Sequence, residues 1–196
     1  MATVTEANVC IVESIDFLQE DSLKEGEVIS RTLRMSDKRS QYVYVRSRRE
    51  LERLVCEFGR SSFRYLHISC HGNEEGFATT LDFIPSEEMA GLLEPHMNRR
   101  RLFISACLAT NSGFARKLLA TSGCLSILGP EDLMSFDDAA IFWSSFYHIM
   151  FKTNPDSMNN HQIELAVERC AALVDEKFRF FRRQNGKFVG STIPSP

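Results

Sequence analysis

Residues 65–72 read YLHISCHG, an apolar run that ends in His71 and Gly72. Such a run is typical of a buried strand, and the glycine marks the point where the chain turns away. A second run of this kind, RLFISAC at 101–107, ends in Cys107. The carboxyl ends of neighbouring parallel strands lie at one edge of a sheet. We therefore expect His71 and Cys107 to face each other there.

Extended and helical patterns alternate along the chain. The segments that we predict as strands are 8–15, 64–72, 101–107 and 124–130, with 75–84 extended and 27–46 an extended pair that turns near 36–40. The segments that we predict as helices are 47–61, 86–98 with Ser86 as N-cap, 111–123, 135–152 and 160–184. This alternation predicts an α/β fold, a three-layer α/β/α sandwich with a mostly parallel central sheet.

The composition is that of an ordinary globular chain. It has 196 residues, 43% of them hydrophobic, and a net charge of −3. The length suits one domain, predicted over 1–190, with a flexible tail at 191–196. The weak charge gives no field that favours nucleic acid or an anionic membrane. With no signal-peptide pattern and no long apolar run, we expect a cytoplasmic protein with no nucleic-acid and no membrane partner.

The six cysteines do not form any CxxC pair, and most lie in apolar runs. A disulfide scaffold or a zinc ribbon is therefore not expected. The histidines, cysteines and carboxylates likewise show no spacing typical of metal ligands, so we expect chemistry without a metal or another cofactor.

A cysteine and a histidine side by side are the minimal apparatus for nucleophilic catalysis by a thiol. We predict Cys107 as the nucleophile and His71 as the general base, which takes and returns the proton. A nearby imidazolium or a helix N-terminus lowers the pKa of a thiol, and a helix is expected to begin near Gly113. The oxyanion needs main-chain N–H donors, for which Gly72 and Cys107 itself are the candidates.

Two neighbours offer alternatives to this pair. Cys70 directly precedes His71, but side chains along a strand alternate between its faces, so Cys70 points away into apolar packing. His67 shares a face with His71, and we expect it to pack with one satisfied hydrogen bond. Cys107 taken alone would be read as an ordinary buried cysteine, and it is the placement of His71 that favours the nucleophile.

YLHISCHG together with RRLFISAC (residues 100–107) resembles the caspase-like cysteine peptidases of clan CD, and specifically the CHAT-domain family. The segment FARKLLATSGCLSILGPEDLMSFDDAAIFWSSFYHIM at 114–150 continues the resemblance, which covers roughly residues 60–150. Two departures argue against a caspase proper and against assumed Asp specificity. The interval from His71 to Cys107 is shorter than the roughly 50 residues of caspases, and their Gln-Ala-Cys-Arg-Gly box is absent.

The resemblance implies a caspase-like fold and a cysteine endopeptidase that acts on a protein substrate. No long linker follows Cys107, so we expect a single uncut chain. The resemblance also implies a bacterial defence or regulated cell-death pathway and a substrate such as a gasdermin-like effector. Because the sequence has no sensor repeats, we expect activation by a separate sensor or activator protein or by self-association. In caspase-like enzymes the end of the first strand helps to build the S1 pocket. Here Glu13 and Asp16 lie at that end, and a carboxylate would favour a basic P1 residue.

Two other classes of function stay open. The chain could be a catalytically silent caspase-like module that binds a protein partner. It could also be an α/β small-molecule binder, but that class needs a glycine-rich phosphate loop, and neither GxGxxG nor GxxxxGK[ST] appears in the sequence.

Overall fold

The computed structural model describes residues 4–194, and within them seven strands form the main sheet in the order β2-β1-β3-β6-β7-β8-β9. The pairs from β2 to β7 are parallel, while β8 and β9 are antiparallel additions at one edge. These strands are β1 (Glu6–Ser14), β2 (Ser40–Tyr44), β3 (Phe63–Asn73), β6 (Arg101–Ser105), β7 (Ser126–Pro130), β8 (Phe178–Gln184) and β9 (Lys187–Ile193). The short strands β4 (Gly76–Ala78) and β5 (Phe83–Pro85) extend β3 as an antiparallel meander.

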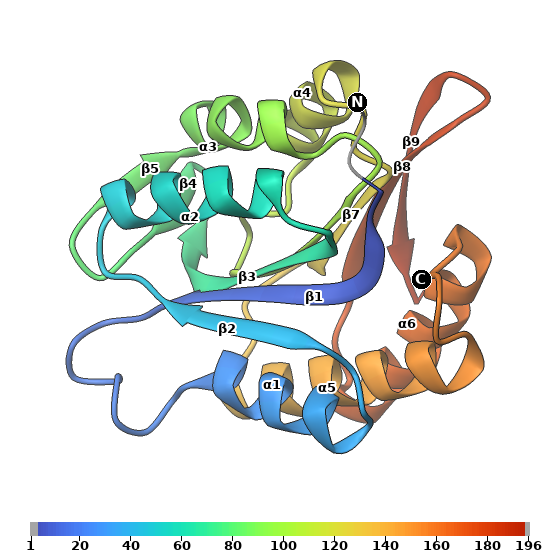
Figure 1. Cartoon of the computed structure of the whole chain (residues 1–196), viewed down its shortest axis with the longest axis horizontal. Helices are drawn as coiled ribbons and strands as arrows, with labels where there is room; N and C mark the ends of the chain where they lie inside the picture. The colour runs from blue at the N-terminus through green and yellow to red at the C-terminus, as the bar shows by residue number, and fades with distance from the viewer. Residues whose placement is uncertain (1–3, 195–196) are drawn as a thin grey trace.

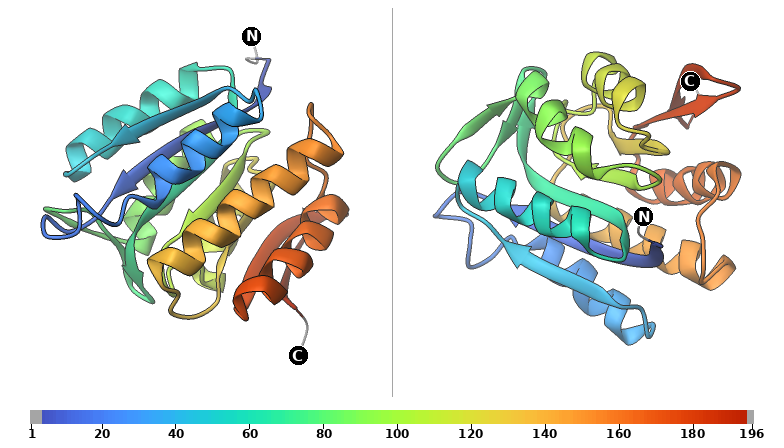
Figure 2. Two further views of the ribbon diagram at one scale, coloured as in Figure 1. Left: turned by 90° about the horizontal axis from the view of Figure 1, so that it is seen from below. Right: turned by 45° about the horizontal axis from the view of Figure 1, so that its top comes forward.

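Helices cover both faces of the sheet (Figures 1 and 2). One layer contains α2 (Arg48–Arg60), α3 (Ser86–Leu93) with the short η1 (Glu94–His96), and α4 (Ser112–Thr121). The other contains α1 (Glu25–Met35), α5 (Phe136–Thr153) and α6 (Asn160–Val174). The predicted α/β fold with a mostly parallel central sheet between helix layers is confirmed. Within residues 4–194, every helix is too short or too polar to cross a bilayer.

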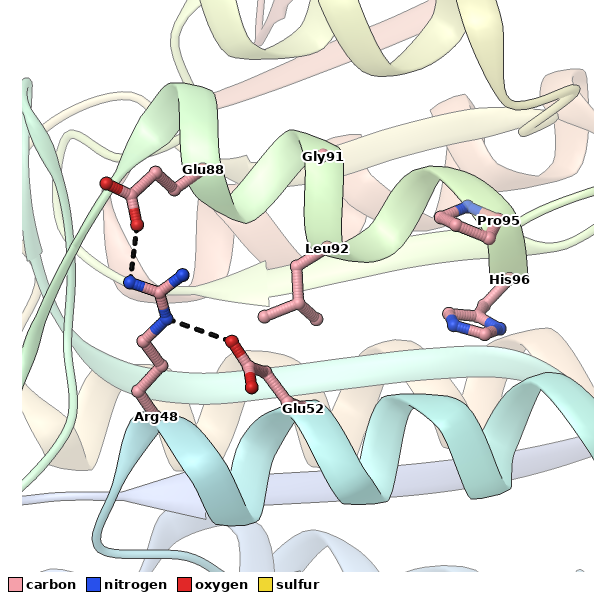
Figure 3. Close-up of a pocket in the computed structure, with 7 residues that line it drawn as sticks. All are labelled: Arg48, Glu52, Glu88, Gly91, Leu92, Pro95 and His96. Carbon is pink, nitrogen blue, oxygen red and sulfur yellow. Dashed lines mark hydrogen bonds and ion pairs between the residues drawn. The ribbon is translucent and has the colours of Figure 1, made fainter.

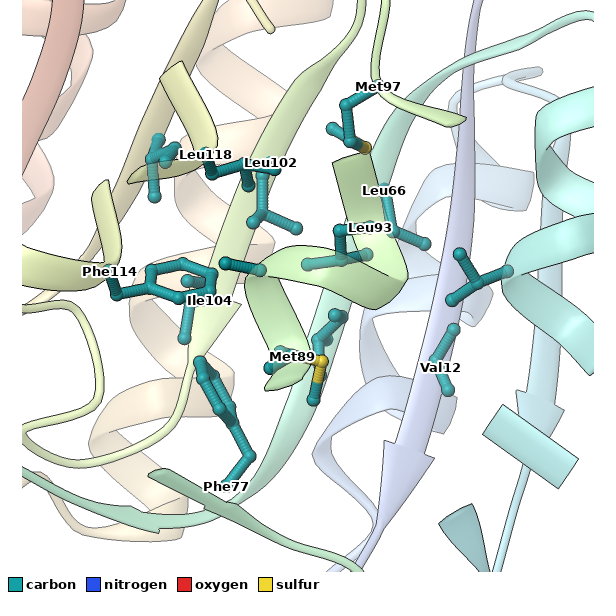
Figure 4. Close-up of a cluster of buried hydrophobic side chains, with 14 of the residues drawn as sticks. Val12, Leu66, Phe77, Met89, Leu93, Met97, Leu102, Ile104, Phe114 and Leu118 are labelled. Atoms are coloured by element: carbon teal, nitrogen blue, oxygen red, sulfur yellow. The ribbon is translucent and has the colours of Figure 1, made fainter. Parts of the chain in front are cut away.

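The two helix layers give the sheet two different cores. Between the sheet and α2, α3 and α4 the side chains are mainly aliphatic, with Leu66, Leu102 and Ile104 at the centre (Figure 4). On the other face Phe103 packs against the aromatic side chains of α5. Leu102, Phe103 and Ile104 thus alternate between the faces, as the period of a strand requires.

The segment 27–46, expected to be an extended pair, is instead helix α1 followed by the single strand β2. Ile29 and Leu33 are four residues apart on the buried face of α1, and that spacing is helical. The N-cap residue of α1 provides no side-chain hydrogen bond. Instead, the buried carboxylate of Glu13 accepts the Gly26 N–H at 2.8 Å. A residue of β1 therefore satisfies one N–H of the first turn, and the local sequence pattern does not reveal that contact.

The last predicted helix, 160–184, is also different. Helix α6 ends at Val174, and Asp175 takes a left-handed conformation with φ 55°. Strand β8 then buries Phe178 and Phe180 on one face, with the period of a strand rather than a helix. Residues 191–193, expected within a flexible tail, are part of β9 and pair with β8. Residues 195–196 of that tail lie outside the described residues.

Ser86 is the first residue of α3 rather than its N-cap, which is Pro85. The hydroxyl of Ser86 makes no hydrogen bond, while its N–H donates to the Glu75 carbonyl at 2.8 Å. The Ser86 N–H is therefore satisfied by a contact with the β3–β4 turn, and the helix starts directly from β5.

The aromatic core gives a direct test of this packing. Phe103 is fully buried, and its ring centroid lies 5.4 Å from that of Phe146 and 5.7 Å from that of Tyr147. Phe103→Ala leaves a cavity that rigid neighbours cannot fill, so we expect the free energy of unfolding to fall by about 3–5 kcal/mol in urea titrations. Phe83→Ala removes a ring that is 46% exposed and should cost less than about 1 kcal/mol. Equal losses would contradict the described core.

Candidate active site

The pairing of β3 with β6 aligns the two predicted catalytic residues. The strands are parallel, and Ser69 lies opposite Ser105 at the end of their shared ladder. His71 and Cys107 each follow two residues later, so the register brings both residues to the same edge of the sheet. Beyond the ladder, β3 turns to pair with β4, with His71 opposite Ala78.

Gly72 lies against the turn that carries Cys107. A Cβ atom at Gly72 would be 3.0 Å from Ala109 Cβ and 3.1 Å from both Ala106 Cβ and the Cys107 carbonyl oxygen. These contacts are tighter than most Cβ contacts, so a side chain at position 72 would push the Cys107 turn away by a few tenths of an ångström. The turn itself is tight, because the Ala109 N–H donates to the Cys107 carbonyl at 2.7 Å and Leu108 has φ 59°.

The Cys107 thiol is half-buried and opens into a cavity of about 120 Å³ that His71 also lines. The Cys107 Sγ accepts a hydrogen bond from the Met134 N–H at 3.4 Å. The S–H group donates to the Met134 carbonyl oxygen, which lies 3.6 Å from Sγ. Met134, Ser135 and Phe136, at the start of α5, form the opposite wall of the cavity. No hydrogen bond between His71 and Cys107 exists in the part of the chain that the structure describes.

The β1–α1 loop holds the His71 ring in position. His71 Nε2 lies 2.6 Å from Gln19 Oε1, an oxygen that can only accept, so Nε2 carries the proton in this contact. The other ring nitrogen, Nδ1, is then free to act as a base. Phe136 supports the ring from the side with an edge-to-face contact at 5.4 Å. A thiol and a base oriented by a third group are the arrangement that nucleophilic catalysis needs.

Cys70 has the environment of a structural cysteine. It is buried, and it packs in the aliphatic core on the opposite face of the sheet from His67. Burial, together with the nearby charge of Glu25, raises the pKa of the Cys70 thiol to about 12. Cys70 therefore stays protonated and unreactive at neutral pH.

The two carboxylates predicted near the S1 pocket lie in different places. Glu13 is fully buried, where its Oε1 accepts the Gly26 N–H and its Oε2 accepts the Tyr42 O–H at 2.7 Å. Burial raises the pKa of Glu13 to about 7 despite these hydrogen bonds. Asp16 is exposed, and its Oδ2 lies 3.7 Å from His71 Nε2. Glu13 thus supports the start of α1, and Asp16 lies beside the His71 ring.

The carboxylate that does line the cavity is Glu25, which the sequence analysis missed. It is the first residue of α1 and is 3% exposed. Its Oε2 accepts the Ser105 O–H at 3.0 Å, two residues before Cys107 on the chain, while its Oε1 has no hydrogen-bond partner. Glu25 and Glu27 are the acidic residues that are typical of a helix start, and they were the sequence signal for this position. The signal indicates a helix start only if residues 27–46 are recognised as beginning with a helix.

His67 lies beneath the cavity, fully buried, with Nδ1 3.1 Å from the Tyr147 hydroxyl. Its Nε2 lies 3.5 Å from Glu25 Oε1, a distance at which a protonated ring would form an ion pair. The edge of its ring meets Trp143 at 4.9 Å. His67 packs in the core, as we expected, and it also faces the carboxylate at the floor of the cavity.

Comparison with known proteins finds similarity in structure but not in sequence. No protein-family model matches the sequence, and no curated protein matches it either. Among solved structures, the chain is similar to the crystal structure of the Arg specific cysteine proteinase gingipain R (RGPB), with a TM-score of 0.57 and 11% sequence identity.

The match covers 89% of this chain and 48% of the gingipain chain, so this chain spans about half of that length. Gingipain R is a caspase-like cysteine peptidase of clan CD. At this identity the likeness concerns the fold alone. The chain therefore has an α/β fold of the caspase-like type, with a mostly parallel central sheet.

Proposed function

We propose that the chain is a cysteine endopeptidase of the CHAT type, with Cys107 as nucleophile and His71 as general base. The observation that carries the proposal is the register of β3 and β6, which brings both residues to one cavity at the carboxyl edge of the sheet. The caspase-like fold supports it, since thiol peptidases are built on this fold.

In the proposed reaction, His71 takes the proton of Cys107, and the thiolate attacks the carbonyl carbon of the scissile peptide bond. The main-chain N–H groups of Gly72 and Cys107 stabilise the resulting oxyanion. The C–N bond then breaks as His71 gives its proton to the leaving amine. A water molecule, deprotonated by His71, hydrolyses the thioester and releases the thiol.

The substrate class follows from Glu25. Glu25 is a buried carboxylate in the cavity that contains the proposed nucleophile, and its Oε1 makes no hydrogen bond and lies 3.5 Å from His67 Nε2. Such a carboxylate favours a positively charged side chain. We therefore propose cleavage after Lys or Arg. The sequence predicts the same basic P1 preference from Glu13 and Asp16. The protein of similar fold is, by its title, specific for Arg.

The pathway and partners are proposed from the CHAT resemblance alone. They are bacterial defence or regulated cell death in the cytoplasm, a protein substrate such as a gasdermin-like effector, and a separate activator. The engagement of Cys107 with the Met134 main chain favours such an activator, because the thiol has to leave these contacts before it attacks a substrate. The same contacts favour the alternative function, a catalytically silent module that binds a protein partner.

Covalent labelling tests the proposed nucleophile. A peptide chloromethyl ketone with Lys at P1 should add once to the protein, as read by intact mass. We expect the adduct to vanish in Cys107→Ala and to persist in Cys70→Ala, the matched removal of a neighbouring thiol. His71→Ala should slow labelling by about 100-fold or more, the usual contribution of a positioned general base. The proposal is contradicted if Cys107 reacts no faster than an ordinary exposed thiol, even in the presence of the native partner proteins. That result would favour the catalytically silent binding module.

The proposed role of Glu25 in the preference for a basic P1 residue can be tested by removing only its charge. Glu25→Gln keeps the shape of the side chain, and we expect it to reduce the rate ratio of P1-Lys over P1-norleucine labelling by about tenfold or more, the worth of one partly buried ion pair. Glu27→Gln removes an exposed carboxylate from the same helix, where it pairs with Arg31, and should leave the ratio unchanged. A wild-type protein that labels equally with both probes would rule out the role of Glu25.

Gln19 is predicted to be a positioning residue for His71. Gln19→Ala frees Nε2, so we expect Cys107 to label about tenfold more slowly with the ring no longer fixed. Gln19→Glu retains an oxygen that can accept from Nε2, so we expect it to restore most of the labelling rate. A purely structural role of the loop would not explain such a recovery. Gln41→Ala, on the exposed side of β2, is the control. Unchanged labelling in Gln19→Ala would show that the contact does not orient the base.

A further inference from the structure

A second pocket lies at the opposite end of the sheet, where β3 and β6 begin. It has a volume of about 440 Å³, and its lining includes Arg64, Tyr65, Arg99 and Arg101. Residues 65 and 71 are separated by about 20 Å along β3, given the rise of a strand. The pocket is therefore distinct from the candidate active site.

The three arginines have no carboxylate within ion-pair distance anywhere in residues 4–194. Arg64 donates to Thr5 Oγ1 at 3.1 Å and to the main-chain oxygens of Thr5 and Asp156. Arg101 Nη1 donates to Ser126 Oγ at 2.6 Å and to Asn160 Oδ1 at 2.8 Å. These partners are all neutral, and the guanidinium of Arg99 is exposed and makes no hydrogen bond within the described chain.

Another hollow on the surface shows the usual arrangement. Between α2 and α3, Arg48 lies 2.9 Å from Glu52 and 2.6 Å from Glu88, so two carboxylates neutralise one guanidinium (Figure 3). The positive charge of Arg48 in that hollow is therefore balanced by neighbouring carboxylates of the same chain. The pocket at the start of β3 and β6 carries three positive charges and no neutralising group among the described residues.

Burial makes this imbalance costly. Arg101 is 7% exposed, and a buried charge without a counter-charge is unfavourable. Burial, together with the charge of Arg64, lowers the pKa of Arg101. Tyr65 lines the same pocket, and its buried hydroxyl makes no hydrogen bond within 3.5 Å, with the Arg64 side chain and the Met158 main chain as its polar neighbours. An anion between the arginines would relieve the repulsion and could accept from this hydroxyl.

We propose that this pocket binds the phosphate group of a small phosphate monoester. A phosphate offers three acceptor oxygens and close to two negative charges, which suits three guanidinium groups better than a carboxylate does. Leu125 and Met158 give the pocket an apolar wall on which the organic part of the ligand packs. The site does not depend on the peptidase activity, and its test does not involve Cys107.

Titration calorimetry of the whole chain at fixed ionic strength tests the site, with inorganic phosphate, adenosine 5′-monophosphate (AMP) and adenosine as probes. We expect phosphate to bind, AMP to bind more tightly, and adenosine not to bind. Arg64→Gln and Arg99→Gln should each weaken AMP by about tenfold or more, since each removes charge-assisted hydrogen bonds. Arg53→Gln is the matched control, because Arg53 is exposed on α2 and pairs with Glu57.

Arg99→Gln keeps the test valid if Arg64→Gln, which removes the hydrogen bonds to Thr5 and Asp156, prevents folding. The Arg99 side chain makes no hydrogen bond within the described residues that the fold could lose. The proposal is overturned if neither phosphate nor AMP binds at millimolar concentration. It is overturned equally if adenosine binds as tightly as AMP, or if Arg99→Gln and Arg53→Gln bind AMP alike. Equal affinities for phosphate and AMP would contradict the proposed packing of the organic part of the ligand on Leu125 and Met158.

Discussion

The parallel register of β3 and β6 is the constraint on which the candidate site depends. With Ser69 opposite Ser105, His71 and Cys107 follow at equal distances beyond the ladder. A shift of one residue would send every side chain of one strand to the other face, and the thiol and the imidazole would no longer share a cavity. The close approach of Gly72 to the Cys107 turn depends on the same register.

Two buried carboxylates connect the outer parts of the fold to this centre. Glu13 on β1 accepts the Gly26 N–H and so holds the start of α1, and Glu25 on that first turn accepts the Ser105 hydroxyl on β6. The high pKa of Glu13, about 7, reflects the cost of burying this charge. Glu25 is also almost fully buried, and its Oε1 makes no hydrogen bond where the side chain lines the cavity.

The sequence predicted the parts of the fold that local patterns determine. Apolar runs marked β3, β6 and β7, and the strand ends gave His71 and Cys107. Helix α1 was missed because the Gly26 N–H at its start is satisfied by Glu13 of β1, a contact that no local pattern records. Strand β8 was missed because Phe180 and Phe181 are adjacent and break the simple alternation. Gln19 and Glu25 reach the site from a loop and a helix start, whose positions follow only from the folded chain.

The wall that Met134 and Phe136 form has a consequence for the synthesis of the protein. A chain is made from its N-terminus, so His71 and Cys107 leave the ribosome before this wall exists. A nascent chain that ends before α5 has the thiol and the imidazole but neither the Met134 N–H that contacts Sγ nor the ring that supports His71. The cavity is complete only when α5 has been made and has packed on the sheet. The order of the chain therefore places the synthesis of His71 and Cys107 before that of the residues that form the opposite wall of their cavity.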